Sequence, residues 1–141
     1  MDLYTLIATV SLVLQIIILF LLFGGLWLKA KKKFRQHGIV MLVAVVLHTI
    51  TILAVMFPSF RAIMTGDVPI LISTITSIHG VLGIVAEVLG IWIVASWRLR
   101  TSLQYCMPKK KWMLLTIISW LTAIILGVII YLHFYTPYLS L

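Results

Sequence analysis

Charged residues are scarce in this chain. They make up 10% of its 141 residues, and only three of them are acidic, whereas 63% of the residues are hydrophobic. Soluble domains average about 25% charged and about 45–50% apolar residues. One small core in water could not bury so much apolar side chain. The composition therefore excludes an ordinary soluble domain and predicts lipid as the solvent for most of the chain.

Cysteine and the common catalytic motifs are also missing or rare. The single cysteine, Cys106, excludes an internal disulfide framework. The sequence contains no nucleophile elbow, Gly-rich phosphate loop, HExxH motif or paired carboxylates. We therefore expect a non-enzymatic protein. No inverted repeat with broken helices is visible, so the pattern does not favour a transporter either.

Four long apolar runs are present instead. Crossing the hydrocarbon layer takes about 20 apolar residues. Pro58 is predicted to end the second helix, and Pro69 suits the first turn of the third. Because short loops force neighbouring helices to pack antiparallel, the sequence predicts one all-α domain, an up-down-up-down four-helix transmembrane bundle. The predicted spanning helices cover residues 3–28, 38–57, 69–97 and 112–135.

The first apolar run is not expected to be a cleavable signal peptide. A signal peptide begins with basic residues and has an apolar core of roughly 7–15 residues. Here Asp2 opens the chain, and the apolar run extends from Leu3 to Leu28. We expect a retained spanning helix.

The net charge of +8 is concentrated in two clusters between the apolar runs. Lys and Arg in short loops favour the cytoplasmic side, so the pattern predicts both termini outside, in a prokaryotic cytoplasmic membrane. No basic face with interleaved aromatics is present, so we expect membrane lipid and other membrane subunits as partners rather than nucleic acid. Trp27, Trp97 and Trp112, near helix ends, are expected at the interfaces. Ten of the eleven Lys and Arg residues form the clusters: Lys29, Lys31, Lys32, Lys33 and Arg35, then Arg98, Arg100, Lys109, Lys110 and Lys111.

Three polar residues inside the spans need a physical reason. A carboxylate at bilayer depth is costly, so Glu87 is either functional or a protonated carboxyl bonded to a Thr or Ser. His48 and His79 fall at similar depth on two antiparallel helices. Two such histidines are the minimum for a six-coordinate haem b. The alternative is a pair of hydrogen-bonded histidines within the packing seam.

A second group of candidate ligands lies near the basic clusters. His37 and Met41 are one helical turn apart, and Cys106 and Met107 lie in the other basic loop. Imidazole, thioether and thiolate together suit Cu(I). Interfacial residues without a metal are the alternative, so copper and haem b both stay open as cofactors.

Small residues predict where the helices pack. Helices in lipid associate through close contact at such residues. Gly83 and Gly90 share a stripe of the third helix with His79 and Glu87, and the second helix places His48 on one face with His37 and Met41. We expect these stripes to face a third one on the last helix, formed by Ser119, Ala123 and Gly127.

Several of these residues match a known pattern. A basic run leads to His37 with Met41 four residues later, and His79 precedes glycines in the third helix. The last helix has Trp120, Gly127 and Tyr131 in a W-x6-G-x3-Y spacing. Over roughly residues 30–135, the sequence resembles the CtaM/YozB-like family of small four-helix membrane proteins, which is associated with maturation of haem–copper cytochrome oxidase.

The resemblance implies a role in assembly of a respiratory haem–copper oxidase, with haem or copper handled through His37 and His79. The family has a further histidine in the basic loop before the last helix, where this chain has Cys106 instead. The alternatives are a b-type electron carrier that uses His48 and His79, and a structural subunit of a larger membrane complex without a cofactor.

Overall fold

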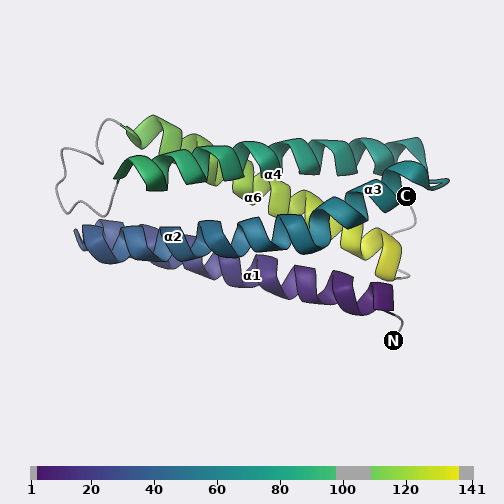
Figure 1. Ribbon diagram of the computed structural model, residues 1–141, viewed down its shortest axis with the longest axis horizontal. Coiled ribbons are helices and arrows are strands. Elements are labelled where there is room, and N and C mark those ends of the chain that lie inside the picture. Colours follow the sequence, from purple (N-terminus) through teal and green to yellow (C-terminus); the bar gives the residue numbers. More distant parts are fainter. Residues whose placement is uncertain (1–2, 98–108, 137–141) are drawn as a thin grey trace.

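The computed structural model describes residues 3–97 and 109–136. These residues form helices and no strands, so the predicted all-α class and the four-helix bundle are confirmed (Figure 1). Three spans are single helices, and the second is built from three consecutive segments. The helices are α1 (Leu3–Ala30), α2 (Phe34–Thr51), η1 (Ile52–Met56), α3 (Phe57–Thr65), α4 (Ile70–Trp97) and α6 (Lys110–Tyr135).

Successive spans run in opposite directions, as predicted. The start of α1 and the end of α6 lie at one end of the bundle (Figure 1). The opposite end holds the α1–α2 connection and the start of α6, and we call it the basic end because Lys29–Lys33 and Lys109–Lys111 lie there. The most extensive contacts join α4 to α6 and α1 to α2, and contacts between α2 and α4 join the two pairs.

A lysine turn connects α1 to α2. Lys32 has a φ of 58°, in the left-handed region, which costs a non-glycine residue about 1–2 kcal/mol. Two hydrogen bonds offset that cost: the Lys33 N–H donates to the Leu28 carbonyl and the Lys32 N–H to the Lys29 carbonyl, each at 3.0 Å. This is the Schellman pattern, which satisfies carbonyls at the end of a helix. The chain therefore reverses direction here without a glycine.

The second span does not end before Pro58, and this part of the prediction is wrong. Helical structure continues to Thr65, and the five residues directly before α3 form a π-helical segment. A proline in a regular α-helix clashes with the carbonyl four residues earlier and lacks an N–H to donate. The wider π-turn moves that carbonyl away, and Pro58 lies in the first turn of α3. Figure 1 shows α3 bending toward α4 at this point.

Trp97 is buried at the basic end, although its place at a helix end predicts an interfacial ring. It is 8% exposed, whereas Trp27 is 58% exposed and Trp112 is 47% exposed. The Trp97 ring lies against Gly38: a Cβ atom at Gly38 would come within 1.7 Å of it. This contact fastens the start of α2 to the end of α4.

The outer surface of the bundle is apolar. Ile70, Phe20 and Leu53 are each more than two-thirds exposed. Each of the four spans is long and apolar enough to cross a membrane. An apolar exterior of this extent requires lipid as the solvent, so this is a membrane protein.

Candidate functional site

A buried polar cluster joins α2 to α4 at the centre of the bundle. His48 Nδ1 and Glu87 Oε2 lie 2.7 Å apart and share a hydrogen bond. Thr49 donates to the other carboxyl oxygen of Glu87. His48 is 1% exposed and Glu87 8% exposed. The energetic problem that Glu87 poses at this depth is therefore met by two hydrogen bonds from the neighbouring helix.

Trp120 closes the cluster from α6. Its indole ring and the His48 imidazole lie with centroids 4.7 Å apart at an interplanar angle of 56°. Trp120 is 1% exposed and belongs to the apolar core with Ile18, Val45 and Ala86. One residue of the W-x6-G-x3-Y spacing thus packs directly against the His48–Glu87 pair.

His79 does not pair with His48 but binds the backbone of α6. Its Nδ1–H donates to the Ala123 carbonyl at 2.7 Å. The ring lies over Gly127, where a Cβ atom would come within 3.1 Å of the His79 Cε1 atom. Gly127 therefore makes room for the imidazole, and His79 fastens α4 to α6.

These contacts do not fit a haem b between His48 and His79. A six-coordinate haem needs an open slot for the porphyrin between two ring nitrogens. The space beside the buried His48 ring is filled by Trp120, and His79 packs against α6 backbone at Ala123 and Gly127. Both rings link helices: His48 joins α2 to α4, and His79 joins α4 to α6.

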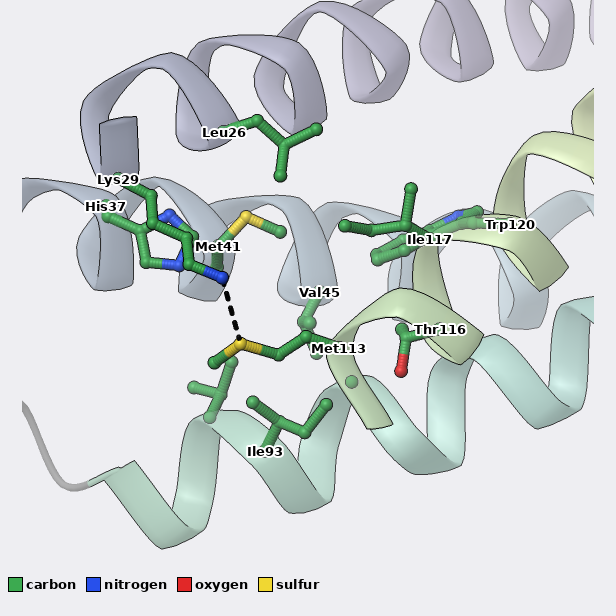
Figure 2. Close-up of a pocket in the computed structure, with 12 residues that line it drawn as sticks. Leu26, Lys29, His37, Met41, Val45, Ile93, Met113, Thr116, Ile117 and Trp120 are labelled. Atoms are coloured by element: carbon green, nitrogen blue, oxygen red, sulfur yellow. Dashed lines mark hydrogen bonds between the residues drawn. The ribbon is translucent and has the colours of Figure 1, made fainter. Parts of the chain in front are cut away.

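A partly open cavity lies between this cluster and the basic end. Its volume is about 50 Å³, and residues of all four spans line it, among them Leu26, Met41, Gly90 and Trp120. A cavity needs at least about 10–15 Å³ to hold one water. The space therefore suits a few water molecules or one metal ion. Figure 2 shows its lining, with His37, Lys29, Met41 and Met113 gathered at one side.

His37 is held in one tautomer by α1. Its Nδ1 lies 2.7 Å from the Gly25 carbonyl, which can only accept a hydrogen bond, so Nδ1 carries the proton. The lone pair of the neutral ring is then on Nε2. A carbonyl partner of this kind orients many metal-binding histidines.

Met41 packs on the same glycine. A Cβ atom at Gly25 would come within 2.7 Å of the Met41 sulfur and within 3.5 Å of His37 Nδ1. Gly25 thus lets both side chains approach the α1 backbone. His37 and Met41, paired in the sequence by their spacing, line one cavity in the structure.

Lys29 and Met113 complete this group, and the spacing of residues in the sequence did not reveal them. The Lys29 ammonium donates to the Met113 sulfur at 3.8 Å (Figure 2). Met113 lies in the first turn of α6, next to Trp112. In the sequence, a methionine at this position looks like an ordinary lipid-facing residue. The only available signal was that both residues lie at span ends: α1 ends and α6 begins at the same end of the bundle.

The remaining predicted residues take packing positions or lie outside the description. Gly83, Gly90, Ser119 and Ala123 are buried. A Cβ atom at Gly90 would come within 3.1 Å of Val45. A Cβ atom at Gly83 would meet no atom within 4 Å. Cys106 lies outside the described residues. Within the described part, no three His, Cys, Asp or Glu residues come together in a group that could hold a metal ion.

Tyr131 links the far end of α6 to α1. The Thr9 hydroxyl donates to the Thr5 carbonyl at 2.7 Å, so the Tyr131 hydroxyl donates to Thr9 Oγ1 at 3.1 Å. The three residues of the W-x6-G-x3-Y spacing thus contact α2, α4 and α1 respectively.

Comparison of the chain with models of protein families, with curated proteins and with solved structures finds no match.

Proposed function

We propose that this chain is a non-enzymatic membrane protein that assists assembly of a respiratory haem–copper oxidase. The resemblance to the CtaM/YozB-like family suggests the role. The support from the molecule is that the residues behind the resemblance make specific contacts inside the bundle. His37 and Met41 share a cavity, and His79 lies over Gly127. Residues whose only role is to face lipid would not need such partners.

The basic end supports a second part of the proposal, the orientation. Both termini lie outside and the basic end faces the cytoplasm of a prokaryotic cell, because Lys29–Lys33 and Lys109–Lys111 together resist translocation. Cysteine labelling in a Cys106→Ser background tests this. A cysteine at Asp67 should react with a membrane-impermeant maleimide added to intact cells, and one at Lys32 only after permeabilisation. The reverse pattern would contradict the orientation.

The assembly role is tested in the organism that encodes the protein. Deleting the gene should lower oxidase activity and the oxidase haem signal in reduced-minus-oxidised spectra of membranes. The wild-type gene should restore both, and His37→Ala and His79→Ala should not. Thr122→Ala is the matched control, because Thr122 is exposed and its hydroxyl donates only to its own helix at Ile118. Full rescue by His79→Ala would count heavily against the role.

A further inference from the structure

We infer that the cavity at the basic end is a binding site for one monovalent soft metal ion, Cu(I), with His37 Nε2 and the sulfurs of Met41 and Met113 as ligands. The inference names a cargo for the proposed assembly role and in that respect rests on it. The three proposed ligands come from α2 and α6.

The donor set selects the metal. Thioethers are soft ligands that bind Cu(I) well and bind Mg²⁺ or Ca²⁺ poorly, and imidazole also suits copper. Two methionines and one histidine line the same small cavity (Figure 2). Within the described residues, no His, Cys, Asp and Glu cluster of the kind that holds zinc is present. This group therefore favours a soft ion over a hard one.

The histidine is already oriented for a metal. Because Nδ1–H donates to the Gly25 carbonyl at 2.7 Å, the ring offers its lone pair at Nε2. Metal-bound histidines usually have such a partner on the second ring nitrogen, which fixes the tautomer and raises the basicity of the ligand. His37 needs no change of tautomer to bind a metal ion.

Lys29 occupies the site as a positive charge. Its ammonium donates to the Met113 sulfur at 3.8 Å, and in Figure 2 it reaches between the Met41 and Met113 side chains. Cu(I) would displace it and leave the net charge of the cavity unchanged, whereas a divalent ion would add one charge in a medium of low dielectric constant. Lys29 lies in the last turn of α1, so its long side chain can turn out to the lipid headgroups.

Binding is measured with purified full-length protein in detergent, under anaerobic conditions, by competition with a chromophoric Cu(I) chelator. All variants carry Cys106→Ser, since a free thiol would itself bind Cu(I). We expect one Cu(I) per chain in this background. Met113→Leu, Met41→Leu and His37→Phe should each weaken binding about tenfold to 100-fold. Met64→Leu is the matched control, because Met64 lies on α3 at the opposite end of the bundle.

Two further variants test the geometry. Lys29→Leu should tighten binding about tenfold or more, because the ammonium no longer competes for the sulfur. Gly25→Ala should weaken it about tenfold, because the new Cβ displaces the Met41 sulfur, whereas Gly24→Ala should have no effect. A Cβ at Gly24 meets no atom within 4 Å, so the comparison isolates the contacts that a Cβ at Gly25 would make with Met41 and His37.

Three results would overturn the inference. They are loss of Cu(I) binding in Cys106→Ser alone, wild-type affinity in Met113→Leu, or equal losses in Met64→Leu and Met113→Leu. Methionine-to-leucine changes conserve volume, so misfolding should not mask the effect.

X-ray absorption of the Cu(I)-loaded Cys106→Ser protein should show sulfur neighbours, and a spectrum with nitrogen or oxygen neighbours only would also refute the site. Intact binding with no oxidase phenotype would refute the assembly role and leave the metal site standing.

Discussion

Replacing Glu87 tests whether the His48–Glu87 pair holds α2 against α4. In Glu87→Ala, His48 Nδ1 loses its partner inside the bundle, and an unsatisfied buried donor or acceptor costs about 1–3 kcal/mol. Thr49 loses less, because its hydroxyl also reaches the Val45 carbonyl at 2.9 Å. The space left by the side chain adds a cavity cost of about 1 kcal/mol. The free energy of unfolding should therefore fall by about 2–4 kcal/mol.

The conservative variant separates hydrogen bonding from shape. Glu87→Gln keeps the volume and one carbonyl oxygen, so it should cost about 0.5–1.5 kcal/mol. A double-mutant cycle with His48→Ala and Glu87→Ala should give a coupling of about 1–2 kcal/mol. Interhelical hydrogen bonds in membranes average about 0.6 kcal/mol, and the carboxyl and imidazole groups favour a value above that average.

The assay is unfolding in mixed micelles with increasing dodecyl sulfate, followed by circular dichroism at fixed detergent concentration. Thr122→Ala serves as the control and should change the free energy of unfolding by less than about 0.5 kcal/mol. A Glu87→Ala protein as stable as the wild type, or a coupling near zero, would refute the reasoning. In that case Glu87 would not stabilise the bundle.

Two further predictions concern glycines that face aromatic or imidazole rings. Gly38→Ala should lower the unfolding midpoint and expose Trp97, because the new Cβ would come within 1.7 Å of the ring; an unchanged midpoint with unshifted tryptophan fluorescence would contradict that contact. Gly127→Ala should cost about 1–3 kcal/mol by overpacking against His79, whereas Gly83→Ala, where no atom lies within 4 Å, should be neutral or mildly stabilising. The same dodecyl sulfate titration measures all three variants, and equal effects at Gly127 and Gly83 would refute the His79 packing.

The four spans could be predicted because lipid imposes a simple requirement on the sequence. Each span must be apolar for about 20 residues, and short loops leave few ways to connect them. The buried placement of Glu87 and His48 also follows from the cost of a polar group in lipid. These features depend on composition along the chain, which a single sequence contains in full.

The partners of each residue could not be predicted in the same way. His48 and His79 lie at similar depth, but depth alone does not give the rotation of each helix, and His48 faces Glu87 instead. The sulfur of Met113 and the ammonium of Lys29 meet because α1 ends and α6 begins at the same end of the bundle. Trp97 fits its site because Gly38 has no side chain, and that fit depends on contact between two helices.

The π-helical segment before Pro58 lets the second span continue past the proline. The second span has 32 residues, which at about 1.5 Å each gives a length of about 48 Å, well beyond the roughly 30 Å of hydrocarbon. A helix longer than the hydrocarbon layer tilts, bends or extends beyond it, and α3, with the exposed Ser59 and Arg61, is the part of this span whose side chains suit the lipid headgroups. Without the π-helical segment Pro58 would end the helix, and the second span would lose this extension.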